Sequence, residues 1–319
     1  MKSFPGFLPV LQNQLEGLSF NSLERVNREG GIEVNDLLNY LTRPTDYTVD
    51  RPYKVDDSSI IDNGKCIPED YWIGRESLNT GETSLCFLVN DESIFKQGSC
   101  QHSELESQLM KFSWVKEIWI IVSPEHKEKV QKISSSVGAR VKILTHYESF
   151  SLAPNNELLL AGNEPVFHSC GPGDLLYVAG ISGLLEIFKN DGGKYIFVTN
   201  VCSLGFNPNP TLLGTHKRHK KPVTWEVSSR SSDSRRGILC EHEGFPQIVE
   251  KFRLSSLTED NEFSLNSNDN FIFNADLDFS TVKWKWHRVK VKRNNRLEVQ
   301  FIRTLYDLSS FFQTTFVNM

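Results

Sequence analysis

Four apolar runs constrain the fold of this chain more than any other feature of its sequence. They are Thr83–Val89, Val115–Val122, Ala139–Leu144 and Lys194–Thr199, and polar segments separate them. A near-continuous apolar run of this length is typical of a strand that is buried on both faces. We therefore expect a mostly parallel sheet at the centre of the protein.

The segments between these runs have helical patterns, at residues 103–112, 123–137 and 175–188. The second should begin at Ser123-Pro124, because serine is a good cap and proline suits the first helical position. Strands that alternate with helices indicate an α/β fold in which helices cover the sheet.

Beyond residue 220 the pattern favours strands. We predict them at Val223–Ser228, Gly237–Glu241, Gln247–Phe252 and Asn270–Phe273. Their mixture of apolar runs and alternation indicates that the sheet is mixed rather than purely parallel.

The first 82 residues have a different character. Residues 7–42 show leucines at helical spacing, whereas residues 43–82 are polar and acidic and contain several prolines. We interpret residues 43–82 as an extended connection that wraps the main domain.

Composition narrows the classes of function. The net charge is −5, which does not favour nucleic acid as a partner. The six cysteines are scattered singly, as reduced thiols are. The sequence starts with no secretory pattern and has no apolar run near the roughly 20 residues that a membrane span needs. We expect a cytoplasmic protein with no membrane partner.

Several distinct blocks of sequence follow one another in a specific order. Residues 162–205 contain a Gly-Pro-Gly-Asp turn, a helix with Ser182-Gly183, and the strand KYIFVTN that ends at Asn200. Further blocks lie at residues 145–160, 225–254, 261–277 and 296–312. In order and separation, these blocks resemble the UTP–glucose-1-phosphate uridylyltransferase (UDP-glucose pyrophosphorylase) family over roughly residues 83–319.

The resemblance implies a Rossmann-like nucleotidyltransferase domain of the glycosyltransferase-A type, with a mixed, mostly parallel sheet. We predict that this nucleotidyltransferase-like domain spans residues 83–319, after a helical and extended N-terminal region at residues 1–82. The implied reaction transfers UMP from UTP to a hexose 1-phosphate and gives a UDP-sugar and pyrophosphate. The implied partners are UTP or a UDP-sugar and a sugar 1-phosphate, with Mg²⁺ as the cofactor of an active enzyme. The block at residues 296–312 resembles a helix of the family.

The matched motifs also imply site residues. A turn rich in glycine at the start of a helix lets the backbone approach a ligand, although it can equally be a cap and a turn alone. An Asn at the end of a buried strand lies where open α/β sheets place ligands. The nucleotide-binding candidates are Gly171, Pro172, Gly173, Asp174 and Asn200. The sugar-binding candidates are Asn200, Glu250 and Asn274, and the catalytic candidates are Lys96 and Arg236.

Four departures from the family pattern weaken the case for catalysis. One is that the sequence given stops at Met319, short of the family segment that carries a phosphate-binding lysine and of the family's C-terminal β-helix. Where the family has a glycine-rich phosphate loop, this chain has Leu88–Ser99, in which Asp91 and Glu92 would repel phosphate and Lys96 would partly compensate. The histidine of the family's Gly-His-Gly-Asp turn is Pro172. The aspartate expected to bind Mg²⁺ is Cys202, a poor ligand for that cation. Asp91, Glu92 and Asp174 are nearby acids, but the sequence assigns no metal ligands.

Two alternatives remain open. The chain could be a catalytically degenerate relative that binds a nucleotide or UDP-sugar or acts as an interaction subunit. The basic segment Lys283–Arg293 could instead bind nucleic acid, with Trp284, Trp286 and Arg288 on one strand face. Such a segment is more often an edge strand whose lysines discourage pairing. His216 and His219 could hold a metal from a helix, although a basic surface loop is the commoner explanation. The sequence does not specify the sugar, the oligomeric state or the role of residues 1–80.

Overall fold

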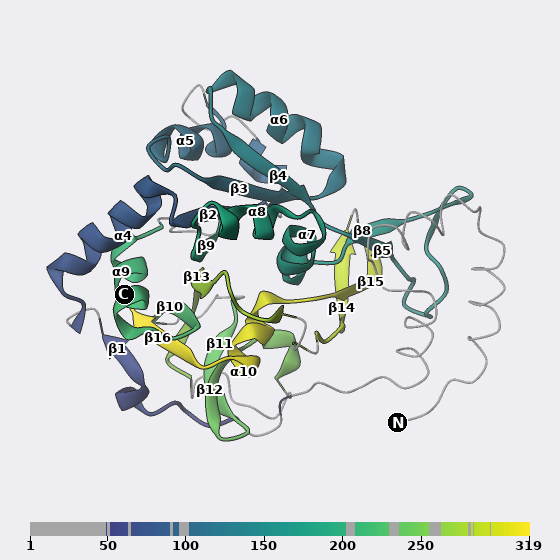
Figure 1. Ribbon diagram of the computed structural model, residues 1–319. Helices are drawn as coiled ribbons and strands as arrows, with labels where there is room; N and C mark the ends of the chain where they lie inside the picture. Colours follow the sequence, from purple (N-terminus) through teal and green to yellow (C-terminus); the bar gives the residue numbers. More distant parts are fainter. Residues whose placement is uncertain are drawn as a thin grey trace. The chain divides into compact units, whose positions relative to one another are not determined.

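The computed structural model (Figure 1) describes residues 49, 52–62, 65–89, 92–95, 102–201, 208–229, 236–254, 263–279, 282, 284–293 and 295–319. They form two compact units. Unit 1 contains His146–Asp174 and Trp284–Leu305, and unit 2 contains Val49–Thr145, Leu175–Lys283 and Tyr306–Met319. Lys96 and Cys202 lie outside the described residues.

Unit 2 is built on one large sheet. In the part of the chain that the structure describes, its strands follow the order β1-β16-β10-β13-β9-β2-β3-β4, and β11 and β12 extend it from β13. These strands are β1 (Ile60–Asp62), β2 (Thr83–Val89), β3 (Ile118–Val122), β4 (Val141–Thr145), β9 (Tyr195–Asn200), β10 (Val223–Ser229), β11 (Ile238–His242), β12 (Phe245–Val249), β13 (Leu265–Asn274) and β16 (Thr314–Asn318).

The directions of the strands confirm the predicted mixed, mostly parallel sheet. Strands β9, β2, β3 and β4 are parallel to one another, as are β1, β16 and β10. Strand β13 lies between these two groups and is antiparallel to both β10 and β9. The four predicted buried strands are confirmed as β2, β3, β4 and β9, although β3 starts at Ile118 rather than Val115.

Helices cover both faces of the parallel strands. These helices are α5 (Glu104–Lys111), α6 (Lys127–Ser136), α7 (Leu175–Ile181) and α8 (Leu184–Asn190). Leu105, Leu109 and Val130 from α5 and α6 share one apolar core with Ile120 of β3. On the opposite face of β3, Trp119 packs edge-on against Phe188 of α8 at 5.3 Å between ring centroids. Figure 1 shows α5 and α6 on one side of β3, with α7 and α8 on the other.

Two predicted helices differ in detail from those observed. The segment predicted to be one helix at 175–188 breaks into α7 and α8 at Ser182-Gly183, because Gly183 adopts φ 73° and ends the helical path. The helix predicted from Ser123 begins with a 3₁₀ turn, η4 (Pro124–His126), before α6. Ser123 lies at the cap position but its side chain makes no capping hydrogen bond.

The prediction of an extended connection over residues 43–82 was wrong for its later part, which forms helix α4 (Pro68–Thr80). Pro68 lies in the first turn, and Asp70 there accepts a hydrogen bond from the Ile67 N–H at 3.2 Å. Gly81 ends the helix in the left-handed conformation. These local signals for a helix outweigh the polar composition of the segment.

Helix α4 packs closely against α9 (Pro210–His219). A Cβ added at Gly74 would lie 1.9 Å from the Pro210 carbonyl oxygen, and one added at Gly214 would lie 1.9 Å from that of Asp70. Buried Asp70 also pairs with Arg218 of α9 at 2.8 Å. Both glycines are therefore required by the close approach of the two helix backbones.

The residues of unit 1 that the structure describes contain three small two-stranded sheets. They are β5 (Glu148–Phe150) with β8 (Phe167–Ser169), β6 (Leu160–Ala161) with β7 (Glu164–Pro165), and β14 (His287–Arg293) with β15 (Arg296–Ile302). Leu152 bridges Val299 of β15, and both side chains are buried.

Strand β15 corrects the expectation of a helix over residues 296–312. The first part of that segment alternates, with Val299 and Phe301 buried, and Asn295 at φ 62° provides the turn that leads back to β14. Only Leu308–Phe311, helix α10, is α-helical there, after the 3₁₀ turn η9 (Leu305–Asp307).

The sequence allows Trp284 and Trp286 to form one face of a strand that could bind nucleic acid, but the structure does not show this arrangement. Trp284 and Trp286 precede strand β14, and Trp286 is buried beneath the Arg303 guanidinium, 3.9 Å from its ring centroid. This tryptophan is thus part of the packing of unit 1. Among the helices that the structure describes, none is both long and apolar enough to cross a membrane.

Replacing Gly214 with alanine should destabilise unit 2. The added Cβ forces α4 and α9 apart, which we expect to lower the free energy of unfolding by about 1–3 kcal/mol, as measured by urea denaturation. Gly180→Ala in α7 is the control, because a Cβ there meets no atom within 4 Å. The control should be neutral or more stable by up to about 1 kcal/mol. Equal losses in both variants would contradict the close helix contact.

Candidate functional site

A bulge between β10 and β13 gathers polar side chains within the sheet of unit 2. Trp225 pairs with Phe271, but the next pair joins Val227 to Ser267. Glu226 alone therefore faces three residues, Asn268, Asp269 and Asn270. Asp269 adopts φ 60°, a conformation that non-glycine residues seldom take. Bulges and backbone strain of this kind are concentrated at functional sites.

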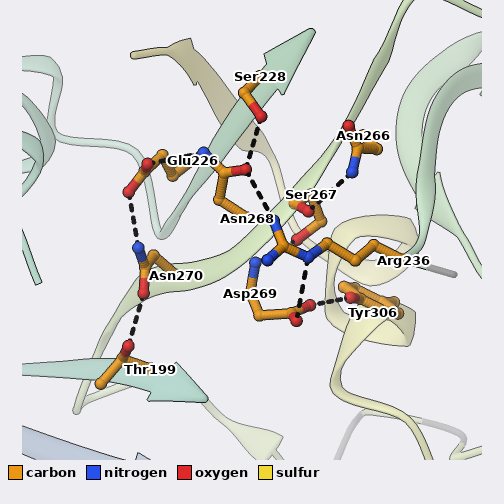
Figure 2. A network of polar contacts seen from close by, with 10 residues as sticks. All are labelled: Thr199, Glu226, Ser228, Arg236, Asn266, Ser267, Asn268, Asp269, Asn270 and Tyr306. Carbon is orange, nitrogen blue, oxygen red and sulfur yellow. Dashed lines mark hydrogen bonds and ion pairs between the residues drawn. The ribbon is translucent and has the colours of Figure 1, made fainter. Parts of the chain in front are cut away.

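Glu226 lies at the centre of a network of hydrogen bonds within this bulge (Figure 2). Its Oε1 accepts from Asn268 Nδ2 at 2.8 Å, and its Oε2 accepts from Asn270 Nδ2 at 2.9 Å. Burial raises the pKa of the Glu226 carboxyl above its ordinary value, against the opposing influence of the two amides and Arg236.

The network extends to the neighbouring elements through the oxygen atoms of the two amides. Thr199 of β9 donates its hydroxyl to Asn270 Oδ1 at 2.6 Å. Asn268 Oδ1 accepts from Ser228 at 2.6 Å and from Arg236 Nη1 at 3.2 Å. Side chains from β9, β10, β13 and the segment before β11 are thus joined in one chain of bonds.

Asp269 forms a second branch. Its carboxylate lies 3.9 Å from Arg236 Nε and accepts a hydrogen bond from the Tyr306 hydroxyl. Burial raises the pKa of Tyr306 well above 10, and the charges of Asp269 and Glu250 raise it further. Tyr306 therefore stays protonated and acts as a donor, which helps to hold Asp269 in its strained conformation.

Three of the predicted site residues lie around this network. Arg236 is a member of it. Glu250 follows β12, and its charge acts on Tyr306. Asn200 is the last residue of β9 and follows Thr199, which binds Asn270. The structure thus brings the strand end and the Arg236 and Glu250 segments of the sequence prediction to one region of unit 2.

Asn274 lies elsewhere. It pairs with Tyr195 at the beginning of β9, five residues from Asn200, which corresponds to about 16 Å along a strand. Its Oδ1 contacts His216 Nε2 at 2.9 Å, and His216 Nδ1 contacts the Thr224 hydroxyl at 2.8 Å. An amide oxygen only accepts, so Nε2 carries the hydrogen and Nδ1 accepts from Thr224. The structure does not bring Asn274 to Asn200 and the bulge.

Burial lowers the pKa of His216 to about 4, so the ring is neutral at physiological pH. Both of its nitrogens are engaged by Thr224 and Asn274. A structural role for His216 and Asn274 therefore accounts for their contacts, without the metal considered for His216 and His219.

The Gly-Pro-Gly-Asp turn belongs to unit 1 and packs against the end of β15. Gly171 has φ 91°, and a Cβ there would lie 2.7 Å from the Arg303 carbonyl oxygen. A Cβ on Gly173 would lie 2.6 Å from the Arg303 Cβ. Pro172 begins the 3₁₀ turn η5 (Pro172–Asp174). These glycines are required by the approach of residues 302–304, and their contact with a nucleotide stays a prediction.

Asp174 is fully buried in the same unit. It accepts from the Tyr147 N–H at 3.1 Å and pairs with Arg303 at 3.4 Å. Burial raises the pKa of its carboxyl to about 7, although Arg303 and the Tyr147 N–H act in the opposite direction. Its side chain therefore ties the turn to residues 147 and 303.

No group of three His, Cys, Asp or Glu side chains gathers into a metal site among the residues that the structure describes. Asp91 and Cys202 fall outside those residues, as does Lys96. Mg²⁺ prefers oxygen ligands and is commonly bound by one or two carboxylates together with phosphates of the substrate. The described residues thus offer no cage made wholly of protein groups.

Sequence reasoning missed Glu226, Asn268, Asp269 and Tyr306. Asn268 and Asp269 lie in a segment with four asparagines, Asn266, Asn268, Asn270 and Asn274, of which the sequence prediction chose only the last. Asn268 and Asn270 lie at the bulge beside the end of β9, whereas Asn274 pairs with the beginning of β9. Tyr306 carries no motif and could be found only from the fold.

Comparison with known proteins points to the same family as the blocks of the sequence. A family model described as UTP–glucose-1-phosphate uridylyltransferase matches residues 129–303, more than half of the chain. The uridylyltransferase 2 of Dictyostelium discoideum is 30% identical over 92 residues, which cover 28% of this chain and 18% of that protein. The match therefore spans less than a fifth of that relative's length.

Solved structures show the same fold. A Trypanosoma brucei UDP-glucose phosphorylase has a TM-score of 0.71 at 15% identity, with 97% of this chain and 74% of that one covered. A Leishmania major UDP-glucose pyrophosphorylase variant in complex with UDP-glucose has a TM-score of 0.68 at 13% identity, with coverages of 98% and 75%.

Asn274→Ala should affect stability rather than ligand binding. It leaves the buried His216 N–H without its acceptor, which we expect to cost about 1–3 kcal/mol of unfolding free energy, as measured by urea denaturation. Asn190→Ala, at the exposed end of α8, is the control and should be neutral. A stability equal to that of the control would contradict the assigned role of Asn274.

Proposed function

This chain belongs to the UTP–glucose-1-phosphate uridylyltransferase family, and on that premise we propose that it binds a UDP-sugar and transfers UMP from UTP to a hexose 1-phosphate. The reaction releases pyrophosphate. The bulge of β10 and β13, with Arg236 and Glu250, forms the sugar side of the site in this proposal.

The cluster of polar groups in this bulge, at the end of β9, is the observation that most supports the proposed function. Open α/β sheets bind ligands at the carboxyl ends of their parallel strands, and Asn200 ends β9 there. Amide, hydroxyl and carboxylate groups are suited to hold sugar hydroxyls, and charged groups make the stronger bonds. A neutral hexose fits this set of groups.

Phosphoryl-type transfer depends mainly on positioning and on neutralisation of charge. In the proposed reaction an oxygen of the sugar 1-phosphate attacks the α-phosphorus of UTP, and the bond to the departing pyrophosphate breaks. Arg236 supplies a fixed cation beside the sugar, since Asn268 and Asp269 hold its guanidinium. We assign the nucleotide to Asn200, and assign Lys96 to the phosphates.

Mg²⁺ is part of the proposal as a partner of UTP. Because the described residues gather no three-ligand site, we propose that the cation enters with the phosphates of the nucleotide. When bound, it would offset phosphate charge.

A second candidate function is binding of a UDP-sugar without turnover. Pro172 and Cys202 stand where the family has a histidine and a metal-binding aspartate, and acidic Asp91 and Glu92 replace part of the phosphate loop. Loss of one preorganised charge-stabilising contact typically costs about 3–4 kcal/mol, or a hundred- to a thousand-fold in rate. These departures support a slow or inactive relative.

Titration calorimetry with UDP-glucose tests the proposal, and Arg236→Ala should weaken binding about tenfold, or about 1.4 kcal/mol. The matched control is Arg140→Ala, which removes an exposed arginine outside the network and should bind as the wild type does. Pyrophosphate release from UTP, glucose 1-phosphate and Mg²⁺ then separates the two functions. Binding with turnover supports the transferase, and binding without turnover supports the second candidate. No binding of UTP or UDP-glucose would refute both.

A further inference from the structure

Glu226 determines the orientation of the two amides that it contacts. An ionised carboxylate can only accept hydrogen bonds, so Asn268 and Asn270 must both turn their nitrogen atoms toward it. Figure 2 shows Glu226 between the two amides, with their oxygen atoms directed to other partners.

Those partners are all donors. Asn270 Oδ1 accepts from Thr199, and Asn268 Oδ1 accepts from Ser228 and from Arg236. Each amide is thus fixed at both ends, and neither can rotate by half a turn without placing donors against donors. The Glu226 carboxylate therefore determines which groups in the bulge donate hydrogen bonds and which accept them.

The two amides differ in exposure. Asn270 is 3% exposed, whereas Asn268 is half-buried. An amide nitrogen carries two hydrogens, and Glu226 takes one from Asn268. No acceptor in the described part of the chain takes the second one. The half-buried Asn268 amide thus keeps a second N–H as a donor, while its oxygen accepts from Arg236.

We propose that Glu226 is a positioning residue, which fixes the Asn268 amide so that its second N–H donates to a hydroxyl oxygen of the bound sugar. This inference rests on the proposed function, because it requires a UDP-sugar at the bulge. Glu226 acts through Asn268 and does not itself touch the sugar.

Two features of the bulge are unfavourable for stability. A carboxylate is buried, and Asp269 is held in a left-handed backbone conformation directly opposite it. Buried charge that is fully hydrogen-bonded and local backbone strain both tend to occur where geometry serves a function.

The test is Glu226→Gln, which keeps the volume but replaces one acceptor with a donor. Asn268 or Asn270 must then lose its bond or turn around. The affinities for UDP-glucose and for UDP are measured by titration calorimetry, and their ratio isolates the sugar. We expect the ratio to fall about five- to tenfold in the variant, while UDP binding is unchanged.

Glu298→Gln is the matched control. Glu298 is also a buried carboxylate, and it accepts from Ser151 and Gln300 in unit 1. This substitution should lower the melting temperature but leave the ratio of affinities as in the wild type. A ratio unchanged in Glu226→Gln, when the wild type prefers UDP-glucose, overturns the inference and leaves the proposed function in place.

The double variant Glu226→Gln/Asn268→Asp separates positioning from structure. The introduced glutamine would accept from Asn270 and donate to the introduced aspartate. That aspartate also accepts from Ser228 and Arg236, so every bond of the network is restored. It has, however, no side-chain N–H for the sugar. We expect the melting temperature to return toward that of the wild type while the ratio stays low.

Recovery of both the melting temperature and the ratio would mean that Glu226 only holds the fold, and the positioning role would be rejected. A wild type that binds UDP-glucose no better than UDP would overturn the sugar site itself, and with it this inference. These outcomes are distinguishable because the first concerns the variants and the second concerns the unmodified protein.

Discussion

The pairing of β13 with two strands at once is the constraint on which the rest of unit 2 depends. This strand joins β9 of one parallel group to β10 of the other, and it is antiparallel to both. Its register with β9 is regular from Asn270 to Asn274, but its register with β10 shifts at Glu226. The mismatch has to be absorbed by a bulge, and the polar side chains of that bulge meet at the end of β9.

The bulge is possible because its polar groups satisfy one another. Burial of a carboxylate is costly unless it is paired and hydrogen-bonded. Glu226 meets this requirement with two amides, and those amides are satisfied by hydroxyl groups and an arginine. The strained Asp269 is held in turn by Tyr306 and Arg236. Each group stabilises the position of the next, so the arrangement is well defined although it is polar.

Much of the fold could be predicted because buried parallel strands have continuous apolar sequences. Thr83–Val89 was assigned correctly from this pattern alone, and β13 was located in part. Segments whose residues carry signals for two different structures were harder to predict. Helix α4 was missed because proline and acidic residues favour both loops and first helical turns. Strand β15 was missed because a family resemblance outweighed its alternation of Val299 and Phe301.

The site could be predicted less well than the fold. Arg236 and Glu250 were named from motifs and lie around the network, but Asn274 was chosen from a segment that also contains Asn266, Asn268 and Asn270. A one-dimensional pattern cannot choose between them, whereas the pairing of β13 with β9 separates them by half a strand or more. Tyr306 is far from the motifs in sequence and reaches Asp269 only through the fold.

The position of Tyr306 has a consequence for how the molecule is assembled. Residues 306–319 supply both Tyr306 and strand β16, which inserts between β1 and β10. During synthesis these residues leave the ribosome after the other strands of the sheet that the structure describes. Until then β10 lacks one neighbour and Asp269 lacks its tyrosine, so the sheet and the polar bulge are completed together by the same late segment.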